Sequence, residues 1–167
     1  MKTIVLAMHG APPKDYPSSE LMEFLKLHMT LEHSVSAFPQ AMYSKHNDLN
    51  EKIRKWPRTK ENDPFWWASH ELAGELSRIT RHEVIVGFNE FCGPSIDEAL
   101  ENAVSLETDE VIVITPMMTP GGTHSENDIP NSIASAQERH PNVSFKYAWP
   151  FELKVVAEFL ARQLSNH

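Results

Sequence analysis

Apolar residues form short unbroken runs that alternate along the chain with longer stretches of mixed polarity. Runs of strand length occupy residues 3–8, 83–88 and 110–115, and such runs are typical of parallel strands that are covered on both faces. Residues 143–148 instead alternate between apolar and polar side chains, which is the pattern of an edge strand. The sequence therefore predicts four strands.

The stretches between these strands carry helix signals. Ser95 and Glu98 form a capping box at the start of a helix with one apolar face. Asp63 and Pro64 supply an N-cap and a first-turn proline for another helix. Its apolar residues recur at helical spacing, and they are Phe65, Ala68, Leu72, Leu76 and Ile79. Two more helices are expected at about residues 18–33 and 152–164.

This alternation of strands and helices predicts an α/β fold with a mostly parallel four-stranded sheet and helices on both faces. A chain of 167 residues is of the usual size for one domain, so residues 1–167 are expected to form a single domain. Residues 34–63 are less regular, with a short helix expected at 47–55, and we interpret this segment as an insertion.

The insertion holds a dense group of basic residues, which are Lys52, Arg54, Lys55, Arg58 and Lys60. A run of charges is most often a solvated face. The alternative is a clamp for an anionic ligand, which would matter because the net charge of the chain is −8.

Composition narrows the class of protein. The apolar fraction of 41% and the charged fraction of 23% are ordinary for a soluble protein, and no apolar stretch has the length of a membrane span. The acidic balance argues against nucleic-acid binding. Cys92 has no second cysteine to pair with, and no signal peptide is apparent, so a cytoplasmic protein is expected.

Candidate functional residues follow three of the predicted strands. His9 comes directly after the first strand, Glu90 follows the second, and His124 lies in a long glycine- and proline-rich loop, residues 116–130, after the third. Ligands of open parallel sheets bind beyond the carboxyl ends of the strands, so these three side chains are expected to converge. The remaining histidines lack such a placement and are interpreted as surface or helix-face residues: His28, His33, His46, His70, His82, His140 and His167.

Three segments resemble the short-form sirohydrochlorin cobaltochelatases and ferrochelatases, which are class II tetrapyrrole chelatases. They are residues 4–10 with their terminal His-Gly, residues 87–100 with the sequence GFNEFCGPSIDEAL, and residues 121–130 with the sequence GGTHSENDIP. The last is the most specific. The resemblance departs at Ala11 and Pro12, where the family usually has serine and arginine.

The resemblance implies a chelatase that inserts cobalt or ferrous iron, or alternatively nickel, into sirohydrochlorin or a related tetrapyrrole. His9, His124 and Glu90 match the family's metal-handling positions, and no nucleotide cofactor is implied. Because a short-form chain supplies half of a two-domain chelatase, a homodimer is also implied.

The chemistry of metal insertion suits these residue types. Neutral imidazole is a good ligand for cobalt, nickel and ferrous iron, and it takes up a proton near neutral pH. Two histidines and a carboxylate leave coordination positions open for the pyrrole nitrogens. Asp128 and Glu126 are candidates to orient His124, although Asp128 would serve equally well as a helix cap.

Two other functions deserve comparison. A histidine phosphatase also has His-Gly after its first strand, but it needs an arginine immediately before that histidine, and Met8 stands there. A non-catalytic carrier of metal or tetrapyrrole would use the same histidines and glutamate. The sequence does not separate a carrier from a chelatase.

Overall fold

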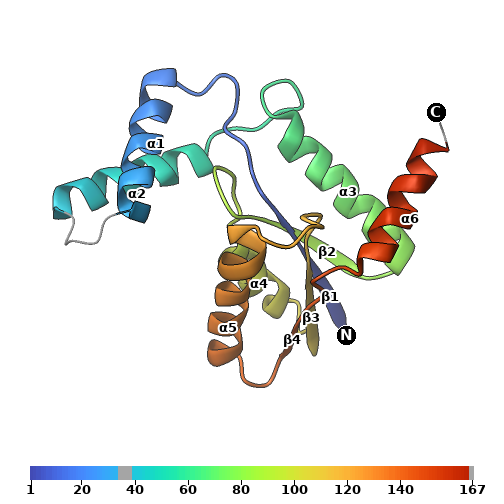
Figure 1. The fold of residues 1–167 in the computed structure, drawn as a ribbon. Helices are drawn as coiled ribbons and strands as arrows, with labels where there is room; N and C mark the ends of the chain where they lie inside the picture. The colour runs from blue at the N-terminus through green and yellow to red at the C-terminus, as the bar shows by residue number, and fades with distance from the viewer. Residues whose placement is uncertain (34–38, 166–167) are drawn as a thin grey trace.

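A sheet of four parallel strands forms the centre of this computed structural model, which describes residues 1–33 and 39–165 (Figure 1). The strands are β1 (Lys2–Met8), β2 (Glu83–Phe88), β3 (Glu110–Ile114) and β4 (Ser144–Tyr147). Their spatial order is β2-β1-β3-β4, and every neighbouring pair is parallel. The prediction of four strands with an edge strand near residues 143–148 is confirmed.

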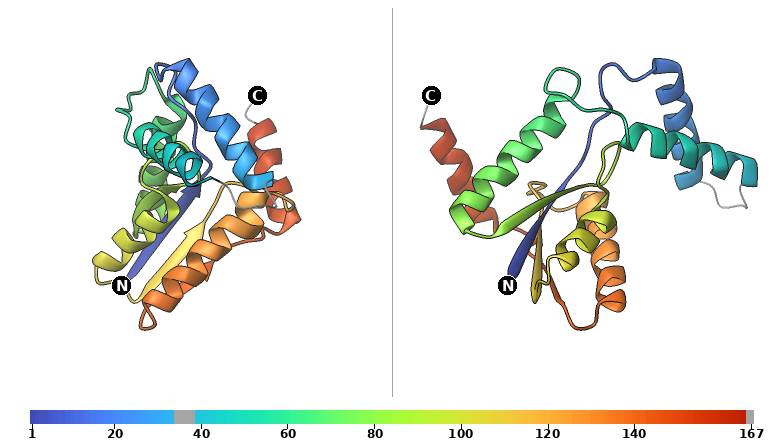
Figure 2. Two further views of the ribbon diagram at one scale, coloured as in Figure 1. Left: turned by 90° about the vertical axis from the view of Figure 1, so that its left-hand side faces the viewer. Right: turned by 180° about the vertical axis from the view of Figure 1, so that it is seen from behind.

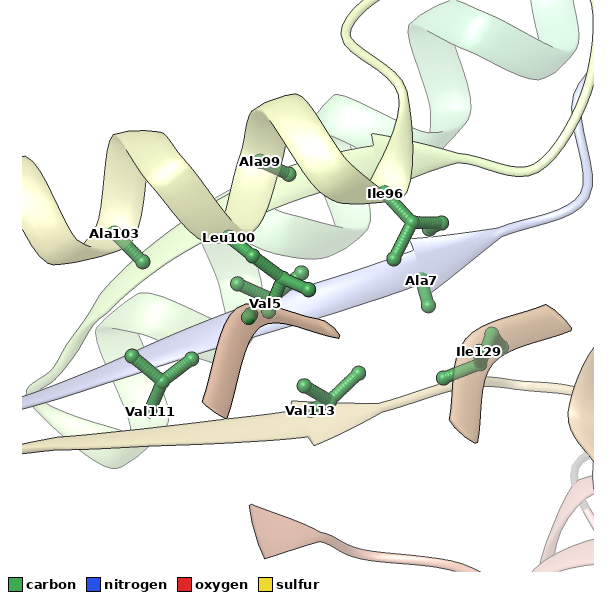
Figure 3. Packing of buried hydrophobic residues seen from close by; sticks show 10 residues of the cluster. Val5, Ala7, Ile96, Ala99, Leu100, Ala103, Val111, Val113 and Ile129 are labelled. Carbon is green, nitrogen blue, oxygen red and sulfur yellow. The ribbon is translucent and has the colours of Figure 1, made fainter. Parts of the chain in front are cut away.

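Helices cover both faces of this sheet. Helices α4 (Ile96–Ser105) and α5 (Ile129–Arg139) lie on one face, and α3 (Pro64–Thr80) lies on the other (Figures 1 and 2). On the first face, Val5 and Val113 pack with Leu100 in a fully buried cluster (Figure 3). On the second face, Phe88 packs near Ala73. The predicted α/β fold class is therefore confirmed.

The helix signals are present as predicted, but one predicted face is wrong. Ser95 and Glu98 make both hydrogen bonds of a capping box at the start of α4. Helix α3 turns Ser69 and Ala73 inward instead of the expected apolar series. Four members of that series remain exposed, and they are Phe65, Ala68, Leu72 and Ile79. The face of α3 toward the sheet therefore consists of Ser69 and Ala73 with the partly buried Trp66.

Helices α1 (Ser18–His33) and α2 (Gln40–Arg54) pack against each other to form what we call the arm. Their contact is built on Phe24, Leu27 and Leu49. Helix α2 begins at Gln40, well before the short helix expected at 47–55, so half of the presumed insertion is a regular helix. Residues 34–38, where that insertion was expected to begin, lie outside the described residues.

The arginines of the basic group have a structural role. Arg58 is ion-paired with Asp63, and the two side chains are only 5% and 1% exposed. Arg58 also donates to the carbonyl of Phe91 at 2.5 Å. Arg54 donates to the carbonyls of Asn89 and Cys92 at 2.7 and 2.6 Å. The anion-clamp hypothesis is therefore wrong for both arginines, because their guanidinium groups already bind the loop after β2.

Two lysines of the basic group, Lys52 on α2 and Lys55 just after it, are also paired. Lys52 lies 2.6 Å from a carboxylate oxygen of Glu20, and Lys55 pairs with Glu51. These ion pairs are exposed, so the solvated-face interpretation holds for the lysines.

The last helix, α6 (Leu153–Leu164), has no buried residue. It lies on the same side of the sheet as α3 (Figure 1). Its exposed large apolar side chains are Leu153, Val155, Phe159, Leu160 and Leu164. Within the described residues, no helix is both long and apolar enough to cross a membrane.

Candidate metal centre

The three residues predicted to converge lie together at the carboxyl-terminal edge of the sheet. His9 follows β1, Glu90 follows β2, and His124 opens the short helical turn η1 (His124–Asp128) after β3. One potential ligand atom from each residue lies within 4.8 Å of the other two. The parallel arrangement of three neighbouring strands therefore assembles a possible metal site from distant parts of the sequence.

The geometry of this cluster leaves one side open. His124 Nε2 lies 3.0 Å from Glu90 Oε1, and these side chains are 20% and 26% exposed. The His9 and His124 rings meet edge to face, with centroids 4.7 Å apart. His9 itself is exposed. A ligand can therefore approach the cluster from the His9 side.

Backbone contacts between two loops fix His9 beside Glu90. The amide of Glu90 donates to the carbonyl of His9 at 2.8 Å, and the amide of Asn89 donates to the carbonyl of Met8 at 2.9 Å. Gly10 has a φ of 112°, and a Cβ added there would lie 1.9 Å from the Glu90 carbonyl oxygen. Only glycine permits this approach, so the His-Gly pair is explained by local geometry.

The loop that carries His124 is shorter than predicted. The sequence suggested irregular structure across residues 116–130, but η1 is a π-helical turn that runs directly into α5. The amide of Ile129 donates to the carbonyl of His124, as the wider π-helical hydrogen bond requires. Single π-helical turns are frequent at functional sites.

The turn also places Asp128 behind His124. Asp128 Oδ2 lies 2.6 Å from His124 Nδ1, and Asp128 makes no side-chain cap to α5. The sequence left two roles open for Asp128, helix cap or orienting residue. Its contact with His124 favours the orienting role. Glu126 instead accepts a hydrogen bond from the amide of Gly121 at 2.7 Å, so it has no such contact.

The carboxylates control the charge of this cluster. The hydrogen bond to Glu90, followed by that to Asp128, raises the pKa of His124 despite partial burial. The same bond to His124 lowers the pKa of Glu90. These two pKa shifts favour a protonated His124 beside an ionised Glu90. A metal bound at Nε2 would replace the proton on that nitrogen, while Nδ1–H continued to donate to Asp128, as histidine ligands usually do to a neighbouring carboxylate.

Two other features are less suited to metal chemistry. A hollow of about 670 Å³ lies between α2 and α4, but none of its lining residues belongs to the His9, Glu90 and His124 cluster. The thiol of Cys92 is fully buried, and burial raises its pKa to about 11. The thiolate that a metal would need is disfavoured.

The sequence interpretation overlooked two histidines. His28 and His46 do lie on helix faces, as expected, but both are half-buried and line a pocket together with Glu90. Their sequence positions give no signal of this, because the pocket depends on how the arm packs against the loop after β2. The side chain of His33 and residue His167 lie outside the described part of the chain.

Comparison with known protein families gives one match over more than half of the chain. The family model named CbiX matches residues 67–165, which include Glu90, His124 and Asp128. The chain belongs to the CbiX family. The matched region begins within α3 and extends through α6, so the arm and His9 lie outside it.

Similarity to a curated relative is local. A sirohydrochlorin cobaltochelatase of Priestia megaterium is 36% identical over 63 residues, which are 38% of this chain and 20% of that protein. The match therefore spans about a fifth of the length of the curated relative.

Solved structures in the comparison are distant in sequence. The chelatase SirB of Bacillus subtilis subspecies spizizenii, in complex with cobalt, is 17% identical with a TM-score of 0.46, covering 98% of this chain and 50% of that one. A CbiX protein of Marinobacter aquaeolei is 16% identical with a TM-score of 0.44, and both chains are covered completely.

Proposed function

We propose that this protein is a chelatase that inserts a divalent transition-metal ion into sirohydrochlorin or a related tetrapyrrole. The observation that supports this most directly is the convergence of His9, Glu90 and His124 at one edge of the sheet, within 4.8 Å. Membership of the CbiX family, together with a relative described as a sirohydrochlorin cobaltochelatase, supports this choice of substrate.

Metal insertion requires a site that binds a metal ion and accepts protons. Inserting M²⁺ into the free-base ring forms bonds to the pyrrole nitrogens and releases two pyrrole protons. In the proposed site, His9 and His124 bind the incoming ion, and Glu90 is placed to bind the ion or accept a proton. Asp128 keeps the His124 ring in a fixed orientation through Nδ1. Cobalt, ferrous iron and nickel all accept this set of ligands.

Turnover is the decisive measurement, because a carrier would use the same residues. Protein at a small fraction of the sirohydrochlorin concentration is mixed anaerobically with Co²⁺, Fe²⁺ or Ni²⁺, and the absorbance of the metallated ring is followed against metal-only controls. We expect several turnovers above the spontaneous rate, and the relative rates identify the preferred metal. A spectral change that stops at one equivalent would instead identify a carrier.

Substitution of His124 tests the assigned site. We expect His124→Ala to lower the rate of metal insertion by about 100-fold or more, since it removes both a ligand and a proton acceptor. His140→Ala is a matched control, because His140 is also paired with a carboxylate, that of Glu101 at 2.8 Å. Insertion by His124→Ala at the rate of His140→Ala would contradict the assignment.

We also propose that two copies of the chain associate. Helix α6 exposes Phe159 and Leu160 by 54% and 53%, and none of its residues is buried. Nearby on the same side of the sheet, α3 exposes Leu72 and Ile79. Large apolar side chains exposed on a helix that buries none of its residues mark an interaction site. A second copy offers the same apolar helices, so a symmetric contact would cover both.

Analytical ultracentrifugation tests the association. The protein is expected to sediment as a dimer, and Phe159→Glu combined with Leu160→Glu should convert it to a monomer. Met22→Glu provides the control, because Met22 is 66% exposed on α1, away from α6. A monomeric parent protein, or dissociation by the control alone, would exclude α6 as the interface.

A further inference from the structure

The arm contains a second pair of imidazoles. His28 on α1 and His46 on α2 face each other, with 3.2 Å between His28 Nδ1 and His46 Nε2. Their rings are nearly parallel, at 11°. Phe24 stacks on both rings and is itself part of the apolar contact between the helices. The pair is therefore held in place by the packing of α1 on α2.

The separation of these two nitrogens suits a shared metal ion. Two nitrogens that each lie about 2.1 Å from one ion are separated by roughly 3.0 Å at an octahedral angle and 3.4 Å at a tetrahedral angle. The observed 3.2 Å falls between these values. Imidazole pairs favour borderline divalent ions such as Co²⁺, Ni²⁺, Zn²⁺ and Fe²⁺ over Mg²⁺ or Ca²⁺.

The pair stands between the protein surface and Glu90. On its outer side, His28 and His46 line a hollow of about 420 Å³ with Tyr43 and Asn47. On its inner side, the same two histidines line a more enclosed pocket of about 80 Å³ together with Glu90. That inner volume holds two or three water molecules, so it accommodates an ion with a few waters but not a tetrapyrrole.

The charges around the inner pocket favour passage of an ion over storage. Arg54 also lines this pocket, and its guanidinium donates hydrogen bonds to the carbonyls of Asn89 and Cys92. Its positive charge weakens the binding of a cation at the histidine pair. Glu90 at the far wall supplies the opposite charge and belongs to the metal centre.

We propose that His28 and His46 form a loading site for the divalent metal substrate, from which the ion moves through the inner pocket to Glu90 and on to His9 and His124. This inference rests on the proposed chelatase function for its purpose. The metal site itself is testable without any tetrapyrrole.

Binding of Co²⁺ alone tests the site. In the variant His9→Ala/His124→Ala, isothermal titration calorimetry is expected to show one weak equivalent of Co²⁺. Adding His28→Phe and His46→Phe should abolish that equivalent, because phenylalanine preserves stacking on Phe24 but has no nitrogen ligand. Adding His70→Phe is the control, since His70 is exposed on α3. Unchanged Co²⁺ binding after loss of His28 and His46 would overturn the proposal.

Steady-state kinetics tests the role in loading. In the full chain, His46→Phe is expected to raise the apparent KM for Co²⁺ by about 10-fold or more, with kcat changed less than about 3-fold and the KM for sirohydrochlorin unchanged. Circular dichroism checks that the variant is folded. An unchanged KM for Co²⁺ would refute the loading role.

The two failures are distinguishable. If the parent protein shows no turnover while the histidine pair still binds Co²⁺, the chelatase function fails and the metal site stands. If turnover is normal and the histidine pair binds no Co²⁺, the loading site fails and the chelatase function stands.

Discussion

The sheet region and the arm are held by different kinds of contact. In the sheet region, Val5, Val113 and Leu100 belong to a fully buried apolar cluster beneath α4 and α5. The arm has a small apolar contact of its own, and Arg54 from α2 and Arg58, just beyond it, bind the loop after β2 through polar bonds. Apolar packing therefore holds the sheet from whose strand ends the candidate metal centre extends, whereas the guanidinium groups of Arg54 and Arg58 join the arm to the loop after β2.

Among the variants that test this difference, Arg58→Ala should lower the free energy of unfolding the most. It leaves the buried Asp63 carboxylate without its ion pair, and breaking a buried pair in this way costs about 3–5 kcal/mol. Urea unfolding followed by circular dichroism measures the loss. Lys60→Ala is the control. Lys60 is exposed, and its Nζ lies 5.9 Å from the centre of the Trp67 ring. A loss below about 1 kcal/mol for Arg58→Ala would mean that polar bonds do not hold the arm.

Arg54→Ala should weaken the arm more selectively. Loss of its hydrogen bonds to the carbonyls of Asn89 and Cys92 should lower the free energy of unfolding by about 1–3 kcal/mol. Hydrogen exchange should increase in residues 88–92 and α2 more than in β3. Arg78→Ala is matched in charge but involves a side chain that is 69% exposed, so its effect should stay below about 0.5 kcal/mol. Equal exchange in both variants would remove the distinction between arm and sheet.

A pair of glycines tests the close packing of the sheet region. A Cβ added at Gly87 would lie 2.8 Å from the Cβ of Ala99, whereas one added at Gly74 meets nothing within 4 Å. Gly87→Ala should therefore lower the free energy of unfolding by about 1–3 kcal/mol. Gly74→Ala should raise it by about 0.5–1 kcal/mol, because alanine favours the helix more than glycine does. Thermal unfolding compares them. The same sign for both changes would contradict close packing at Gly87 and open space at Gly74.

The smallest expected effect on stability is that of Glu110→Gln, at the amino-terminal end of β3. Hydrogen bonds from Lys146 and then Lys2 lower the pKa of Glu110 to about 2. A lowered pKa in the folded protein gives stability that is present above the ordinary value of 4.5 and is lost as the pH falls toward 2. Glu110→Gln should lower the Tm at pH 7 by less than about 3 °C. This difference should vanish by pH 2, and a difference that persists there would exclude the ion pairs as its cause.

Much of the candidate metal centre was predictable because its residues follow strands directly. Unbroken apolar runs indicated parallel strands, and parallel strands bring their carboxyl ends to one edge, so His9, Glu90 and His124 were expected to meet. The same local logic identified the Ser95 capping box. It failed on the inward face of α3, where Ser69 and Ala73 are buried, because the face that a helix turns inward depends on its packing against the sheet.

By itself, the sequence determined the strands, the sheet class and the three residues of the candidate metal centre, because periodicity and position after a strand are local properties. Only the tertiary structure decided that Arg54 and Arg58 bind backbone carbonyls and that His28 meets His46 3.2 Å away. These contacts join segments separated by 18 or more positions in the chain. Their partners depend on how the arm packs, and no local pattern of charge or hydrophobicity encodes that packing.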